Sequence, residues 1–285
     1  MLKTVALPLA LILIMLGMGM TLRPVDFKRI IRKPKASILG LVLQILLLPL
    51  IAYILCTLFG LQGELAVGLM VIASCPGGAT SNMISHLSKG DTALSVSLTA
   101  FSSLITPFTI PLIVGASLSH FLETDSTITL PFIKTLIQLL IVSVIPICIG
   151  MLIHKIFPER TRKLEKPVNI MSLTFLAIIV VIAVIQEEDL LHQFSIAGPA
   201  AFSLNAITMS IGFGLATLIG LGLRQRITLS IETGIQNGTL ALAISLGLLE
   251  NPRIAIPAVV YSLIMFINGC VMILVFGRRS AQSHS

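Results

Sequence analysis

The residue best suited to chemistry is a single acid inside a long apolar stretch. Glu232 lies within the stretch Ile227 to Leu249, which contains no other Asp, Glu, Lys or Arg. A charged carboxylate in the middle of a membrane helix costs roughly 2.5–3.5 kcal/mol on insertion scales, and such residues mark ion or proton paths. Glu232 must therefore be protonated, bound to a cation or in contact with water. The alternative is a neutral carboxyl group that is hydrogen-bonded inside a helix bundle.

Several neutral side chains could supply oxygen atoms to the same site. Ser95 and Thr99 are spaced i, i+4 and so share one helix face. With the carboxylate, these hydroxyl and amide groups form the oxygen set that a small hard cation selects. A lone Gln in a membrane helix has another common role, which is to hold helices together. The full set of candidates is Gln44, Ser81, Asn82, Ser95, Thr99 and Gln236.

Two polar, glycine-containing segments interrupt apolar stretches. The first reads SCPGGATSN, from Ser74 to Asn82, and the second reads IETGIQNGT, from Ile231 to Thr239. Proline removes a backbone donor and glycine lowers helix propensity, so we expect a helix to unwind at the first segment and to expose backbone carbonyl groups. The alternative is a simple kink whose hydroxyl groups bond back to the helix.

A transition-metal site is not expected. The four cysteines lie in separate apolar stretches without a CxxC spacing, so we interpret them as small buried side chains. The five histidines fall at predicted boundaries, in loops or in the tail, where we expect them to be solvated. Neither residue type forms a cluster that would favour such a metal.

The elements that carry these residues are predicted to be membrane helices. Of the 285 residues, 55% are hydrophobic and only 11% are charged, too few to coat a water-facing surface. This composition excludes a water-soluble enzyme. The expected fold is an all-α polytopic membrane protein with about nine spans. They are Thr4 to Leu22, Ala36 to Gly63, Leu65 to Leu87, Thr92 to Leu122, Thr135 to Ile153, Val168 to Gln186, Leu190 to Leu223, Ile227 to Leu249 and Ile254 to Gly277.

The distribution of basic residues predicts the orientation of the spans. The segments that follow the odd-numbered spans contain 16 of the 19 Lys and Arg residues. Basic residues favour the cytoplasmic side of short loops, so we expect an outside N-terminus and a cytoplasmic C-terminus in the cell's inner (plasma) membrane. The net charge of +7 is thus explained by basic residues that mark the cytoplasmic side of the membrane. With no Trp and two Tyr, the chain offers no surface for nucleic acid.

The chain is predicted to form one transporter-like membrane domain, 1–285, built from two repeats. Residues 1–153 would hold the first repeat and an extra span, 154–167 a cytoplasmic linker, and 168–277 the second repeat. The two interrupted spans are the third and the eighth, and an odd offset of five gives them opposite orientations. Inverted repeats with interrupted helices at matching positions indicate a transporter binding site.

Two long motifs carry a resemblance to a known family. The run GLMVIASCPGGATSNMISHLSKGDTALSVSLTAFSSLITPFTIPL and the later IETGIQNGTLALAIS resemble the bile acid:sodium symporter family. The resemblance covers nearly the whole chain, including MLGMGMTL near the start. It implies a core domain and a panel domain, with two broken helices that cross at mid-membrane in the core.

The resemblance also implies site residues. The family's first sodium site matches Ser81, Asn82, Ser95, Thr99 and Glu232. Its second site matches Gln44, Glu232 and Gln236, with the backbone carbonyl groups of Thr233 and Ile235. The substrate crevice matches Asn237 and the peptide around Ala79 and Thr80.

Two departures from the family pattern stand out. Bacterial relatives commonly have ten spans, whereas nine are expected here, with no counterpart of the first, which would leave the fifth span without a partner in the other repeat. Some bile-acid-binding relatives carry a His-Asn pair where this chain has Met265 and Phe266. The loss of those polar contacts argues against a bile acid as the natural substrate, but the sequence leaves bile acids, keto acids, pantothenate-like acids and sulfonates open.

The expected function is sodium-coupled import of a small organic anion by alternating access, with sodium, the anion and the bilayer as partners and no cofactor. One alternative is a proton-coupled carrier in which Glu232 titrates. Another is a membrane sensor that binds the anion without moving it. An intramembrane enzyme is not expected, because the sequence contains neither HExxH nor GxSxG.

Overall fold

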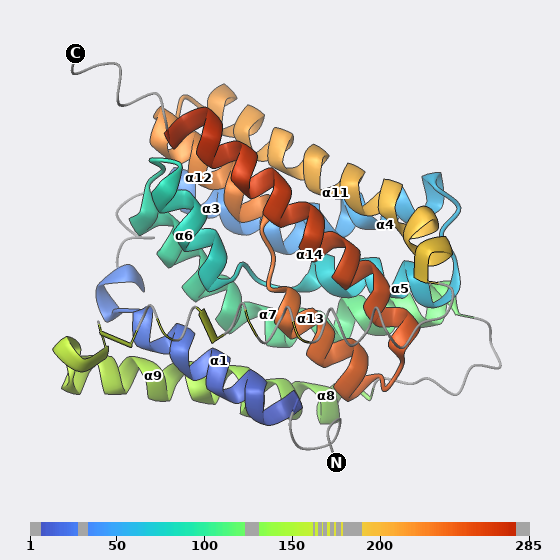
Figure 1. Cartoon of the computed structure of the whole chain (residues 1–285), viewed down its shortest axis with the longest axis horizontal. Coiled ribbons are helices and arrows are strands. Elements are labelled where there is room, and N and C mark those ends of the chain that lie inside the picture. The colour runs from blue at the N-terminus through green and yellow to red at the C-terminus, as the bar shows by residue number, and fades with distance from the viewer. Residues whose placement is uncertain are drawn as a thin grey trace.

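The structure is a computed structural model that describes residues 7–27, 34–122, 131–161 and 190–277, with a few positions between 163 and 178. The regular elements in these ranges are helices (Figure 1). In chain order they are α1 (Leu7–Thr21), α3 (Pro34–Val42), η2 (Leu43–Leu47), α4 (Leu48–Leu58), α5 (Gly63–Ser74), α6 (Ala79–Leu87), α7 (Thr92–Phe121), α8 (Phe132–Leu139), η3 (Leu140–Val144), α9 (Ile145–Ile156), α11 (Leu190–Leu218), α12 (Leu223–Gly234), α13 (Gly238–Ala243), η4 (Ile244–Leu248), α14 (Pro252–Met272) and η5 (Ile273–Gly277).

Among the residues that the structure describes, five helices are long and apolar enough to cross a membrane. Several of them are continuous through a short π-helical turn (η), as in α3–η2–α4. Their 25 to 30 residues exceed the roughly 20 needed to span a bilayer, which confirms a multi-pass helical membrane protein. The predicted first span corresponds to the shorter α1, and the predicted sixth span, 168–186, lies largely outside the described residues. The five helices are Pro34–Leu58, Thr92–Phe121, Phe132–Ile156, His192–Leu218 and Pro252–Gly277.

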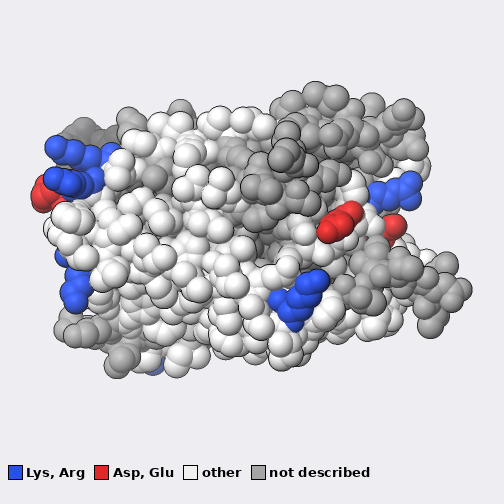
Figure 2. All heavy atoms as spheres, turned by 90° about the horizontal axis from the view of Figure 1, so that it is seen from below, with Lys and Arg blue, Asp and Glu red and all other residues white. Residues whose placement is uncertain are grey.

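The outer surface is apolar, while polar groups gather inside. Figure 2 shows a broad uncharged region that separates charged side chains at the left end from others in the right-hand part of this face. Large apolar side chains, Leu46 and Leu218 among them, are exposed on the outside of the molecule, as expected for a surface that contacts lipid. Buried polar side chains, Glu232 and Gln44 among them, occupy the interior. The molecule therefore has the polarity of a membrane protein with an internal polar site.

Two cysteines and one histidine differ in burial from the sequence prediction. Cys56 and Cys75 are buried as expected, but Cys148 and Cys270 are exposed. A thiol is apolar enough to face lipid, so burial was the wrong expectation for those two. His154 is also not solvated: it is buried, and its Nδ1 pairs with the hydroxyl group of Thr161 at 2.8 Å.

The two predicted helix breaks are confirmed. α5 ends at Ser74, the chain is extended at Cys75, and α6 begins at Ala79. Likewise α12 ends at Gly234, Ile235 is extended, and α13 begins at Gly238. The breaks meet through an antiparallel bridge between Gly77 and Gln236 and a 2.8 Å hydrogen bond from the Asn237 amide to the Pro76 carbonyl. Because lipid offers no partners, each unwound segment satisfies part of the other's backbone.

The two broken segments share the same local geometry. The bounds of α5 (63 and 74) and of α12 (223 and 234) differ by 160 residues, and α7 and α14 begin 160 residues apart as well. Each segment is preceded by a glycine in the left-handed region, Gly60 (φ 64°) and Gly220 (φ 74°). In both turns the next leucine amide bonds back five residues: Leu61 to the Cys56 carbonyl at 2.8 Å, and Leu221 to the Ala216 carbonyl at 3.0 Å.

These two segments enter from opposite ends of α7. The turn before α5 lies beside the end of α7, where Gly60 and His120 line the same small cavity. By contrast, α12 begins beside the start of α7, where the Asp91 amide donates to the Arg224 carbonyl at 3.1 Å. The ribbon in Figure 1 shows the same arrangement. α5 and α12 therefore run in opposite directions and bring their breaks together beside Thr99, in the first third of α7.

Candidate functional site

Glu232 is buried in the last turns of α12, with only 1% of its surface exposed. Two hydroxyl groups from one face of α7 point at its carboxylate. Ser95 Oγ lies 2.5 Å from Glu232 Oε1, and Thr99 Oγ1 lies 3.1 Å from Oε2. In the part of the chain that the structure describes, the hydrogen bonds of this carboxylate go to neutral groups and not to Lys or Arg. Its charge is therefore not balanced by a neighbouring cationic side chain.

The cluster around the carboxylate has more oxygen lone pairs than protons. Ser95 Oγ also lies 2.8 Å from Asn82 Oδ1, yet a hydroxyl group carries one proton for its two neighbours. Thr99 likewise has one proton for two acceptors, because its Oγ1 also lies 3.4 Å from Asn82 Oδ1. Ser81 Oγ, 3.5 Å from Thr99 Oγ1, donates to the Gly78 carbonyl at 2.8 Å and so turns lone pairs toward the cluster. A small hard cation would satisfy this excess of oxygen acceptors.

A second cluster adjoins the first on the other side of Glu232. Gln44, in the π-helical turn η2, donates from Nε2 to Gln236 Oε1 at 3.4 Å. Gln236 in turn donates to the backbone carbonyl groups of Glu232 (3.2 Å) and Thr233 (3.0 Å). The buried Gln44 Oε1 has no hydrogen-bond partner among the described residues. A buried acceptor without a partner is costly, so this oxygen is available to a ligand such as a cation.

Gly77 lies between the two clusters. A β-carbon added to it would stand 2.8 Å from Glu232 Oε2, 3.1 Å from Gln44 Nε2 and 3.3 Å from Thr99 Oγ1. These separations are shorter than van der Waals contact, so any side chain would intrude on the oxygen atoms. The sequence singled out this glycine only for unwinding the helix. In the structure it also keeps open the space between Glu232 and Gln44.

The structure thus brings together most of the residues predicted to hold sodium. Among the described residues, no three or more His, Cys, Asp or Glu side chains gather as metal ligands. The site itself consists of one carboxylate and neutral oxygen-bearing side chains. Ile235 was predicted to contribute only its backbone carbonyl group. Its side chain contacts neither cluster through a hydrogen bond, and its backbone is extended directly after Gly234. The residues that the structure gathers are Gln44, Ser81, Asn82, Ser95, Thr99, Glu232, Thr233 and Gln236.

Sequence reasoning missed a set of residues that hold the end of α12. The Gly234 carbonyl accepts hydrogen bonds from Asn205 Nδ2 at 2.6 Å and from the Tyr261 hydroxyl group at 2.9 Å. Asn268 Nδ2 donates to Asn205 Oδ1 at 2.6 Å. These contacts join α11, α12 and α14 two residues beyond Glu232. A signal was present, because Asn205 and Asn268 are isolated amides in apolar stretches, the same feature that singled out Gln44.

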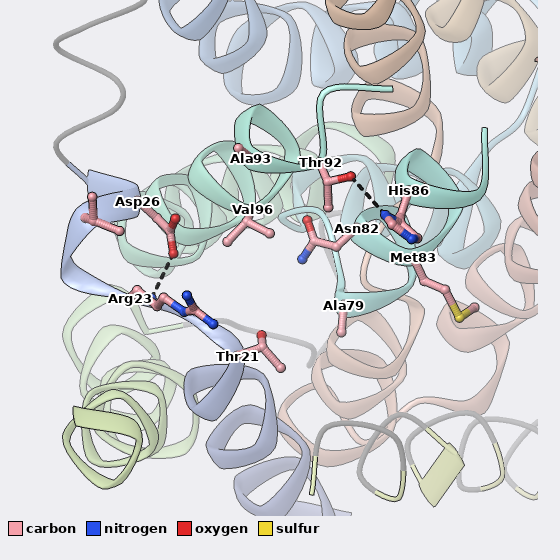
Figure 3. Close-up of a pocket in the computed structure, with 11 residues that line it drawn as sticks. Thr21, Arg23, Asp26, Ala79, Asn82, Met83, His86, Thr92, Ala93 and Val96 are labelled. Carbon is pink, nitrogen blue, oxygen red and sulfur yellow. Dashed lines mark hydrogen bonds between the residues drawn. The ribbon is translucent and has the colours of Figure 1, made fainter. Parts of the chain in front are cut away.

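The predicted substrate residues are more dispersed. Ala79, the first residue of α6, lines a cavity of about 520 Å³ together with Asn82 of the sodium cluster (Figure 3). Thr80 is half-buried and does not line this cavity. Asn237 is buried and caps α13, with its Oδ1 accepting from the Leu240 amide at 3.0 Å. Only Ala79 of the three therefore faces the cavity that adjoins the cluster.

Replacing Gln44 by Leu tests whether the unpaired Gln44 Oε1 contributes to sodium binding. Without sodium, we expect the Tm of the purified variant to stay close to the parent's. The variant loses the unpaired Gln44 Oε1, and an unsatisfied buried acceptor costs about 1–3 kcal/mol, but it also removes the Gln44 donor from Gln236 Oε1. With sodium, the gain in Tm should be smaller than the parent's. The control is Gln138→Leu, which replaces a half-buried glutamine of α8 and should leave the sodium effect on Tm unchanged. An undiminished sodium effect in Gln44→Leu would remove Gln44 from the site.

The chain is similar to one family profile and to several known proteins. The sequence profile of the Sodium Bile acid symporter family matches residues 8–194. The uncharacterized sodium-dependent transporter YocS of Bacillus subtilis is 30% identical over 261 residues, which cover 91% of this chain and 79% of that protein. The ileal sodium/bile acid cotransporter of Oryctolagus cuniculus is 30% identical over 84% of this chain and 68% of its own length. The probable sodium/metabolite cotransporter BASS1, chloroplastic, of Arabidopsis thaliana is 28% identical, with shares of 94% and 65%.

Proposed function

Because the chain belongs to the sodium bile acid symporter family, whose members are transporters and not enzymes, we propose that it imports a small organic anion together with sodium. Sodium-dependent transport is the activity named for YocS, and sodium-coupled transport of a bile acid or a metabolite is named for the other two relatives. We propose a small anion rather than a bile acid, since Met265 and Phe266 supply no polar contacts for the larger molecule.

The observation that carries the proposal is the excess of oxygen acceptors around Glu232. One sodium ion would bind among Ser81, Asn82, Ser95, Thr99 and Glu232. A second would bind among Gln44, Gln236, Glu232 and the carbonyl groups of Thr233 and Ile235. The unpartnered Gln44 Oε1 and the single protons of Ser95 and Thr99 support these assignments.

Filling both sites would couple sodium to movement of the anion. The ions would neutralise the carboxylate and fix the two unwound segments, which meet at Gly77 and Gln236. Backbone amides beside these breaks would then become available to the anion. Each charge moved inward gains about 2.3 kcal/mol per 100 mV of membrane potential. Two sodium ions that enter with one monoanion still carry one net positive charge down that potential.

We further propose that the two halves are inverted repeats that form a core and a panel. The 160-residue register and the opposite directions of α5 and α12 support the repeats. α1 and α9 pack closely on each other, with Gly19 against the backbone at Ile147 and Gly150 against that at Leu16, and would belong to the panel. The basic segments support a cytoplasmic C-terminus in the plasma membrane, with an outside N-terminus.

The test is whether sodium itself stabilises the detergent-purified protein. Sodium should raise the Tm, while potassium and choline at the same ionic strength should not. At a sodium concentration 100 times Kd, binding to the folded state alone contributes about 2.7 kcal/mol. Equal Tm values in the three salts would contradict the proposal and favour a proton-coupled carrier. A counterflow assay in proteoliposomes would separate a carrier from a sensor that only binds the anion.

A further inference from the structure

The cavity beside the sodium cluster contains one strongly basic side chain. It lies between the end of α1, the start of α6 and the first turns of α7, and its volume of about 520 Å³ is in the range of small-molecule sites (Figure 3). Arg23 is the only Lys or Arg among the described residues that line it. His86 and Thr92, whose side chains pair at 3.4 Å, form part of the opposite wall. Among the described residues, the lining therefore combines the Arg23 guanidinium and the Asp26 carboxylate with uncharged side chains such as Thr21, Asn82 and Thr92.

A reciprocal pair of hydrogen bonds fixes the turn that carries Arg23. The Arg23 amide donates to Asp26 Oδ2 at 2.8 Å, and the Asp26 amide donates to the Arg23 carbonyl at 2.9 Å. Asp26 is 95% buried and lines the same cavity, where its carboxylate holds the turn. In Figure 3 the Arg23 side chain extends from this turn toward Thr21. The backbone thus places the guanidinium group at the cavity rather than leaving it on a flexible loop.

Asn82 connects this cavity to the sodium cluster. Its Oδ1 lies 2.8 Å from Ser95 Oγ and 3.4 Å from Thr99 Oγ1, so its amide nitrogen points away from the cluster, and Figure 3 shows that nitrogen on the cavity side. Ala79, at the first turn of α6, lines the cavity next to it. Donor groups from the end of α1 and from α6 therefore converge on one space. A cation held at Asn82 Oδ1 would also hold the amide in the orientation that presents its N–H groups to a ligand.

We propose that Arg23 binds the negative group of the transported solute, and that this solute is a small organic molecule with a single carboxylate or sulfonate. The inference rests on the function proposed above and adds the residue that recognises the charge. One guanidinium group matches one such group through paired hydrogen bonds. Sodium bound at Asn82 prepares the other side of the same pocket, so solute binding is stronger when sodium is present.

The test compares small carboxylates with their neutral amides as probes of stability. Pyruvate, benzoate and nicotinate, each paired with its amide, are added to the purified protein in sodium or in potassium buffer. At least one acid should raise the Tm in sodium while its amide does not. In Arg23→Gln the concentration needed for half of this effect should rise at least about tenfold, and Arg23→Lys should restore part of the binding. Lys35→Gln removes a charge from the exposed first turn of α3 and should behave as the parent.

Each result of this experiment decides the question. Carboxylate effects of equal size in the parent and in Arg23→Gln would overturn the assignment of Arg23. A failure of all three acids to exceed their amides in the parent would overturn the proposed class of solute. Stabilisation by sodium alone should be the same in Arg23→Gln as in the parent, which also shows that the variant is folded. Loss of the sodium effect in the parent would instead contradict the sodium-coupled function, so the two failures are distinguishable.

Discussion

In a Glu232→Gln variant, sodium is expected to lose its stabilising effect on the purified protein, and sodium-dependent uptake into proteoliposomes is expected to fall to background. Both proposed sites use this carboxylate, which supplies the only negative charge in the two clusters. Gln has nearly the same size and can keep contact with Ser95 and Thr99, so the fold should survive. A fall in sodium affinity of at least about tenfold corresponds to about 1.4 kcal/mol. The measurement is Tm against sodium concentration, followed by uptake in sodium and in choline.

Glu64→Gln is the matched control, since Glu64 is a half-buried acid in the first turn of α5 and outside both clusters. This variant should keep the parent's sodium effect. Uptake that is independent of sodium and equal to the parent's in Glu232→Gln would contradict the mechanism. A parent that shows no sodium effect but takes up solute in response to a pH gradient would favour the proton-coupled alternative.

A second large effect is expected from Gly77→Ala. Gly77 does not require a left-handed backbone, so the variant tests the space for a β-carbon and not the turn. The added methyl group would crowd Glu232 Oε2 and Gln44 Nε2, and overpacking of this kind costs about 1–3 kcal/mol. If most of that cost falls on the sodium-bound state, sodium affinity should drop by about tenfold to a hundredfold. Titration of Tm with sodium measures the change directly.

Gly78→Ala is a close control because it alters the adjacent glycine of the same break. A β-carbon at Gly78 would make ordinary contacts, at 3.7 Å from Asn237 Cα, and the backbone there (φ −116°) suits alanine. This variant should bind sodium nearly as the parent does. Equal losses in the two variants would mean that unwinding of the segment matters, and not the space beside Glu232.

The helix breaks were predictable because their causes are local. Pro76 and the two glycines after it oppose a helix whatever lies around them, and Glu232 is conspicuous in any apolar stretch. The grouping of the site residues came chiefly from the family resemblance. Glu232 contacts residues 133 and 137 positions away, and Gln44 and Gln236 are 192 positions apart. No local pattern in the sequence carries such pairings.

Other features depended on geometry that the sequence does not display. The clamp on Gly234 needs Asn205 and Tyr261 to meet at one carbonyl group, although only the lone Asn was visible as a signal. Arg23 was grouped with the basic residues that set topology, and its place in a cavity depends on the turn that Asp26 holds. The burial of His154 was likewise not visible in the sequence, because it depends on Thr161, whose hydroxyl group pairs with the imidazole ring.

The central claim is that the oxygen cluster around Glu232 binds sodium. Binding of ²²Na⁺ to the purified protein, followed by scintillation proximity, tests it without knowledge of the transported anion. We predict saturable binding that unlabelled sodium displaces, that potassium and choline do not displace, and that is lost in Glu232→Gln but retained in Glu64→Gln. Absence of saturable binding in the parent, or equal binding in the parent and in Glu232→Gln, would contradict the claim.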